Sequence, residues 1–205
     1  MKIFPPALAA VLLVALSSCS VLPEPQAVTV YLLPGAVQAP STKPPVDWAL
    51  RLATPQASQV LDSTRIAVVA RANQISGYKS ARWSDPVPAL LRDRLLDAFQ
   101  ADGRVQALSS EAKPLYADLL LVSELHAFQA EYREGGVQVS IRLDARLVRS
   151  ASQRIVATRR FEVLQPVAGD QLAQVIPAFG QASDRLAAQL LDWTLEQGRV
   201  SLPAR

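Results

Sequence analysis

Alternating apolar and polar residues dominate the third quarter of the chain. The clearest run spans residues 137–147, where six apolar side chains alternate with five polar ones, so it predicts a half-buried strand. Residues 117–133 and 153–165 predict two more strands, and Gly135-Gly136 is a hairpin signal. Three consecutive strands with short turns predict an antiparallel meander that has one buried and one solvated face.

Residues 88–103 show the spacing of an amphipathic helix. Its apolar stripe consists of Leu91, Leu95 and Phe99. Ser84 or Asp85 is predicted to cap the start of this helix, and Gly103 to close its end.

A second helical stripe runs through residues 170–196 near the end of the chain. Its members are Leu172, Val175, Ile176, Phe179, Leu186, Leu190 and Trp193. Pro177 and Gly180 predict a kink or break within it. The remaining residues, 198–205, are predicted to form a flexible tail.

The first half of the chain predicts shorter strands at 30–33, 47–55 and 66–69. Residues 74–88 are interpreted as a loop that leads into the first helix. The element order predicts an α+β fold, with a mainly antiparallel sheet and two helices packed on one face. This single domain is expected over residues 30–197.

The N-terminus has the features of an export signal. Lys2 is the one charge in the first 23 residues, and residues 7–16 are wholly apolar, which is too short a run to span a bilayer. Residues 16–19, Leu-Ser-Ser-Cys, resemble a bacterial lipobox. We therefore predict a lipoprotein signal peptide at 1–18, lipidation of Cys19, and a tether at 19–29. An inert Cys19 behind a signal cleaved elsewhere is the alternative.

Composition changes this picture little. A net charge of +3 without a Lys/Arg cluster does not support a nucleic-acid footprint. Cys19 is the one cysteine, so it has no disulfide partner within the chain, and lipidation accounts for it. Two or three acyl chains give stable anchoring, at about 0.8 kcal/mol for each buried methylene. In the bacterial lipoprotein signals that this one resembles, an Asp after the cysteine favours retention in the inner membrane. Ser20 at that position therefore implies the outer membrane.

The sequence offers no catalytic motif, cofactor motif or metal-ligand set, so we expect a protein that is not an enzyme. His126 is the one histidine, and strand alternation places Glu124 on its face. A proton relay is one interpretation of that pair, but a half-exposed strand histidine is favoured because metal sites need three or four ligands. The predicted loop carries Tyr78, Arg82 and Trp83, residue types favoured at interfaces. They are interpreted either as a partner-binding surface or as aromatic side chains packed beneath the loop.

Several segments together resemble the ABC-type transport auxiliary lipoproteins, the PqiC/YmbA-like family. They are YLL at 31–33, RIAVVARANQISGY at 65–78, ARWSDPVPALLRDRLLDAF at 81–99, ADLLLVSELHAF at 117–128, and the paired strands VSIRLDARLV and RRFEV. The resemblance extends from about Tyr31 to Trp193, and the most specific part is Trp83-Ser84-Asp85-Pro86 followed by the Leu-rich helix. Ala70 departs from the proline that is frequent in the family.

The resemblance implies a function without catalysis. Its members are lipid-anchored outer-membrane proteins that face the periplasm of Gram-negative bacteria and accompany an ABC permease, its ATPase and an MCE-domain protein. Such systems move lipids between membranes and support membrane integrity, and the lipoprotein is thought to bind the MCE component. A lipid- or small apolar ligand-carrying periplasmic lipoprotein is the alternative, and an envelope lipoprotein without a transporter is a third. Homo-oligomerisation is left open.

Overall fold

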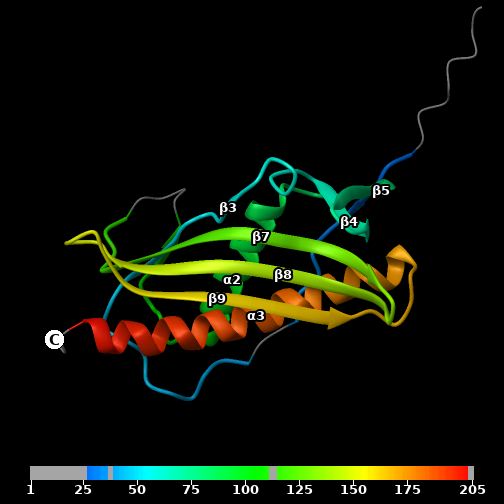
Figure 1. Cartoon of the computed structure of the whole chain (residues 1–205). Helices are drawn as coiled ribbons and strands as arrows, with labels where there is room; N and C mark the ends of the chain where they lie inside the picture. Colours follow the sequence, from blue (N-terminus) through cyan, green and yellow to red (C-terminus); the bar gives the residue numbers. More distant parts are fainter. Residues whose placement is uncertain (1–26, 37–38, 111–114, 203–205) are drawn as a thin grey trace, which may run out of the picture.

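A meander of three long strands forms one side of the molecule (Figure 1). The strands are β7 (Leu119–Arg133), β8 (Gly136–Arg149) and β9 (Arg154–Pro166). β8 pairs antiparallel with β7 on one side and with β9 on the other. Alternate residues of β8 from Val137 to Leu147 are buried, which confirms the predicted meander and its single apolar face.

The structure is a computed structural model that describes residues 27–36, 39–110 and 115–202. The predicted signal peptide, Cys19 and most of the predicted tether lie outside the described residues. Thr29, the last residue of the predicted tether, already belongs to the first strand, β1 (Thr29–Tyr31). A strand at this point was predicted, and it begins one residue earlier than the apolar run.

Three short strands pair, one after another, with the edge of β7 that does not pair with β8. They are β2 (Leu50–Leu52), β3 (Gln56–Ala57) and β4 (Arg65–Arg71), and all three run parallel to β7. β6 (Leu108–Ser110) adds a further parallel strand beside β2. The sheet remains mainly antiparallel because its longest pairings are those of the meander.

The predicted loop at 74–88 is wrong over most of its length, because residues 74–83 form β5 (Gln74–Trp83). A two-residue turn, Ala72-Asn73, joins β4 to β5, and Asn73 adopts the positive φ of 61° that such turns favour. β5 is irregular: four of its residues, 78–81, lie opposite the single β4 residue Ile66. This bulge and the polar composition of the stretch explain why alternation does not reveal the strand.

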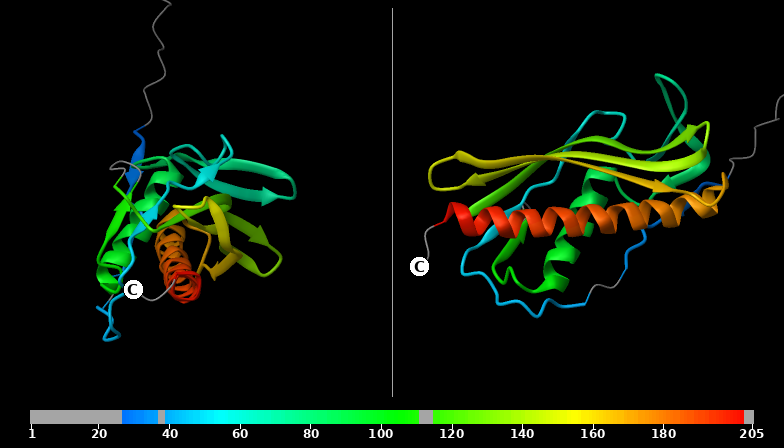
Figure 2. Two further views of the ribbon diagram at one scale, coloured as in Figure 1. Left: turned by 90° about the vertical axis from the view of Figure 1, so that its left-hand side faces the viewer. Right: turned by 60° about the horizontal axis from the view of Figure 1, so that its bottom comes forward.

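Two helices pack on one face of the sheet, as predicted, and together with the sheet they form a single α+β domain (Figure 2). They are α2 (Val87–Asp102) and α3 (Leu172–Ser201). Gly103 closes α2 in the left-handed conformation, at φ 77°, as expected. The predicted cap is wrong: Pro86 occupies the capping position and Ser84 and Asp85 precede it, so neither side chain caps the helix.

α3 differs from its prediction at two points. It is continuous through Pro177 and Gly180, so the expected break is absent. It also extends to Ser201, which overturns the flexible tail for residues 198–201. Gly198 is buried against the ring of Trp48, where a Cβ would lie 2.9 Å from the Cε2 atom of the indole. The glycine therefore serves close packing inside the helix and does not mark its end.

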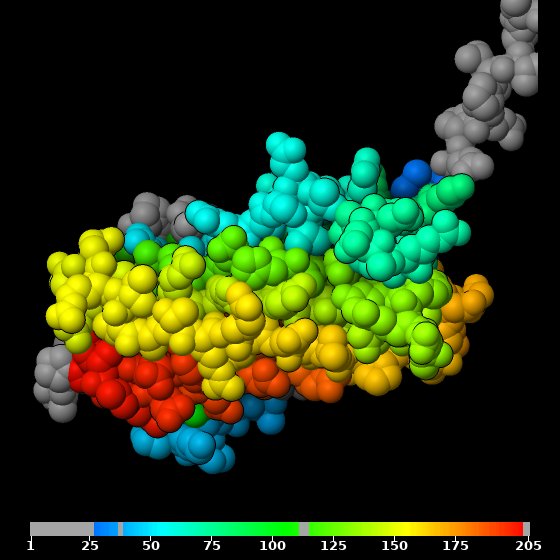
Figure 3. All heavy atoms as spheres, viewed as in Figure 1, coloured from blue at the N-terminus to red at the C-terminus, as the bar shows by residue number. Residues whose placement is uncertain are grey.

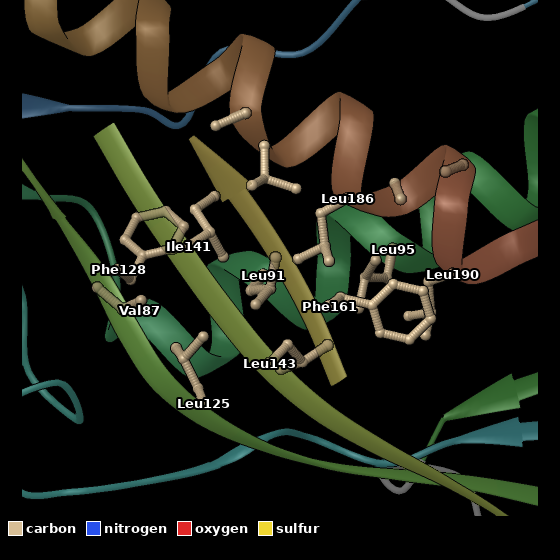
Figure 4. Close-up of a cluster of buried hydrophobic side chains, with 14 of the residues drawn as sticks. Val87, Leu91, Leu95, Leu125, Phe128, Ile141, Leu143, Phe161, Leu186 and Leu190 are labelled. Carbon is tan, nitrogen blue, oxygen red and sulfur yellow. The ribbon is translucent and has the colours of Figure 1, made fainter. Parts of the chain in front are cut away.

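The two helices and the meander enclose one apolar core (Figure 4). Leu91 and Leu95 of α2 and Leu186 of α3 lie against Leu143 of β8 and Phe161 of β9 (Figure 4). All of these side chains are buried, and each contributes about 1.5–3 kcal/mol when it is removed from water.

Gly198→Leu is predicted to lower the free energy of unfolding by about 2 kcal/mol, because the new side chain must displace the Trp48 ring. Urea unfolding measures this change. Arg199→Leu places the same side chain on an exposed neighbouring position and should change stability by less than about 0.5 kcal/mol. Equal effects at the two positions would show that close packing at Gly198 is unimportant.

Candidate functional site

Trp83 belongs to the core and not to a docking surface. Its ring is fully buried, with 0% exposure. It contacts Phe179 of α3 edge to face at 5.3 Å between ring centroids, and Phe128 of β7 at 6.2 Å. The proposal that Trp83 binds a partner is therefore corrected, because its side chain joins β5 to the two elements beneath it. The alternative interpretation, that of a packed aromatic, is the one that the structure supports for this residue.

Tyr78 and Arg82 occupy different environments on the same strand. Tyr78 is half-buried in the β5 bulge, where burial, and secondarily the neighbouring Tyr132 hydroxyl, raise the pKa of its phenol. Arg82 is exposed and lies beside Val30 of β1 in the parallel register. Partner binding by Tyr78 and Arg82 stays a prediction, and Arg82 is the more accessible of the two.

β1 is an edge strand that exposes apolar side chains. Among the described residues it pairs with β5 alone, so its other side is open. Val28, Val30 and Leu32, at alternate positions on one face, are 52%, 49% and 74% exposed. We refer to these three residues and Arg82 as the edge surface. Exposed edges are places where another chain can add a strand, and apolar side chains strengthen that tendency.

A hollow of about 300 Å³ adjoins the edge surface. It lies between Leu32 and the first turns of α2, and three carboxylates line it: Asp85, Asp93 and Asp97. Asp93 forms an ion pair with Arg92 at 2.7 Å. Of these three residues, sequence reasoning singled out only Asp85, and only as a helix cap. The i, i+4 spacing of Asp93 and Asp97 is the signal that places two of them together on one helical face.

An ion pair between the two helices holds the chain that follows β1. The Arg94 guanidinium of α2 donates to the Asp184 carboxylate of α3, with Nε to Oδ1 at 2.6 Å, and also to the Ala36 carbonyl oxygen at 3.0 Å. The Ala36 backbone N–H donates to the other Asp184 oxygen at 3.0 Å. Gly180 allows Pro34 to approach, because a Cβ there would lie 2.8 Å from the Pro34 carbonyl oxygen. These contacts fix the position of the edge surface.

The solvated face of the meander carries a separate polar cluster. His126 Nε2 lies 3.2 Å from Asp144 Oδ2, and Arg160 donates to the same carboxylate at 2.6 and 2.7 Å. Hydrogen bonds from Arg160 are the main reason that the pKa of Asp144 falls to about 2. The contact of His126 is with Asp144, which lies opposite Glu124 in the β7–β8 register, so the expected placement of Glu124 on the face of His126 holds.

In residues 27–36, 39–110 and 115–202, no group of three or more His, Cys, Asp or Glu side chains could hold a metal ion. Within the same ranges, neither helix combines the length and the apolar character needed to cross a membrane.

The fold defines a class of α+β domain that known proteins share. The crystal structure of protein XCC0632 from Xanthomonas campestris is 31% identical, with a TM-score of 0.79, and the match covers 84% of this chain and 97% of that one. A second crystal structure, 16% identical with a TM-score of 0.64, covers 81% of this chain and 97% of its own and shares the fold.

Sequence comparison identifies the family. The profile described as ABC-type transport auxiliary lipoprotein component matches residues 31–190, so the chain belongs to that family. Protein bll6063 of Bradyrhizobium diazoefficiens is 27% identical over 147 residues, which cover 72% of this chain. The match covers 39% of that relative, so this chain spans about two fifths of its length.

Asp184→Ala is predicted to lower the free energy of unfolding by about 3 kcal/mol, because it leaves the buried Arg94 charge without its carboxylate. Urea unfolding gives the change. Asp93→Ala is the matched control: it also removes the carboxylate of an Arg–Asp pair, but one whose aspartate side chain is 59% exposed, against 19% for Asp184. Its expected loss is below about 1 kcal/mol. Losses of the same size in both variants would contradict a structural role for the Arg94–Asp184 pair.

Proposed function

We propose that this chain is a non-catalytic lipoprotein subunit of an intermembrane lipid transport system. In this proposal acyl chains on Cys19 anchor it in the outer membrane, and its domain binds the MCE-domain component in the periplasm. The ABC permease and ATPase of the same system are the further partners. Membership of the auxiliary lipoprotein family is the observation that carries this proposal.

The edge surface is the proposed docking site for the MCE-domain protein. Its three apolar side chains and the open backbone of β1 favour a partner that adds a strand or covers them with its own apolar residues. Arg82 beside Val30, and the carboxylates of the adjoining hollow, provide charges of both signs. Such charges set the orientation and the association rate of a partner more than its affinity.

The tether fits an anchored role. From Cys19 to Thr29 the chain spans ten residue steps, which reach about 35 Å when fully extended. A domain held within that distance of the membrane has a high effective concentration for a partner that reaches the same membrane.

The hollows offer less support for the alternative, a carrier of lipid or of a small apolar ligand. A hollow of about 970 Å³ has three arginines and two glutamates among the residues that line it. Carrier sites are mostly apolar and enclose their ligand, so this composition favours a different role for the hollow.

A photo-crosslinking residue at Arg82 of the full-length protein tests the proposal in cells. We expect it to capture an MCE-domain protein, identified by mass spectrometry. The matched control is the same residue at Arg154, an exposed arginine at the start of β9. Capture of the MCE-domain protein at Arg154 but not at Arg82 would refute the docking site. Capture of lipid alone at Arg82 would favour the carrier.

A further inference from the structure

A groove opens between the ends of two hairpins. β4 and β7 pair in parallel as far as Val69 and Glu131, and beyond that point each strand pairs only with its own hairpin partner. The two turns, at 72–73 and 134–135, therefore point in the same direction. The space between them measures about 970 Å³. We refer to it as the hairpin-end groove, and Figure 3 shows the β4–β5 hairpin lying over the ends of β7 and β8.

Two of the charged side chains in this groove, Glu131 and Arg133, pair with each other. Glu131 is buried and accepts hydrogen bonds from Gln129 at 3.0 Å and from Arg133 at 2.6 and 3.2 Å. Burial alone would raise the pKa of its carboxyl, but these bonds outweigh it and hold the pKa below its usual value. Glu131 and Arg133 thus satisfy each other.

Arg71 and Arg142 line the same groove, and within the described residues neither guanidinium group forms an ion pair or a hydrogen bond. Glu134, in the turn, is the remaining acidic side chain of the lining. The two arginines outnumber it, so the free charge of the groove is positive. Arginine presents several N–H donors in a planar fork, a geometry that matches phosphate oxygens.

The N-terminal chain approaches from the same end of the molecule. β1 is parallel to β5, with Thr29 beside Ala81, so the chain before Thr29 enters from the side of the β4–β5 turn. The right-hand view of Figure 2 places β1 and the two turns toward one end of the molecule. The bulge at 78–81 shortens β5, so the turn lies at most about 23 Å from Ala81, within the roughly 35 Å reach of the tether.

We propose that the hairpin-end groove binds the phosphate group of a phospholipid headgroup through Arg71 and Arg142. The inference rests on the proposed lipid anchor at Cys19, which would hold this end of the domain next to the membrane surface. A phosphodiester carries one negative charge and oxygen acceptors on a small tetrahedral centre, which complements two unpaired guanidinium groups. Tyr132, which lines the groove, and Ile75, which pairs with Val69 of the lining, are both exposed, and such side chains suit the boundary between headgroups and acyl chains.

Phosphorus NMR on the full-length protein in a nonionic detergent tests this inference. The probe is glycerophosphoglycerol, a headgroup phosphodiester without acyl chains, and the second probe is inorganic phosphate. We expect saturable broadening of the glycerophosphoglycerol signal and at least tenfold weaker binding by the Arg71→Gln/Arg142→Gln double variant. The matched control, Arg146→Gln/Arg154→Gln, removes two exposed arginines outside the groove and should bind as the wild type does.

The outcomes separate the two sources of phosphate. A headgroup site is supported if glycerophosphoglycerol binds and inorganic phosphate displaces it only weakly. If inorganic phosphate binds more tightly, the groove is a site for a free anion and the inference is wrong. If both double variants lose the same amount of binding, the binding is a general charge effect and the inference is again wrong. Because neither the MCE-domain protein nor a membrane is present, failure here leaves the crosslinking test of the proposed function unaffected. Unchanged urea midpoints for both double variants exclude unfolding as the cause.

Discussion

The apolar face of the meander is the constraint on which the rest of the structure depends. Three long strands place their inward side chains on one surface, and those of β8 are buried along the whole length of the strand. A surface of that length needs an equally long cover, which α3 supplies as a continuous helix of 30 residues (Figure 1). α2 fills the remaining space beneath β7 and β8 (Figure 4).

The same cover determines where the edge surface lies. α3 brings Phe179 against Trp83, and Gly180 and Asp184 against the segment that follows β1. A short strand of three residues would be marginal alone, but these contacts fix it at the open side of β5. The apolar side chains that remain exposed there are therefore held in a defined orientation, which reduces the entropy that a partner must overcome on binding.

The elements that sequence reasoning identified are those whose pattern is local. The meander and both helices follow from alternation and from a helical stripe that a single stretch contains. β5 was missed because its bulge at 78–81 breaks the period, and the end of α3 because Gly198 packs against Trp48, a residue 150 positions away. For the site, Arg82 was singled out from residue type alone. The edge surface and the hairpin-end groove arise from parallel pairings between distant segments, which periodicity does not encode.

Hydrogen exchange of the full-length protein, with and without the MCE-domain partner, tests the central claim most directly. If the edge surface is the docking site, backbone amides of residues 28–32 and 79–82 gain protection on binding, while those of β9 exchange at unchanged rates. Protection confined to β9 and the solvated face of the meander, with β1 unaffected, would contradict this account.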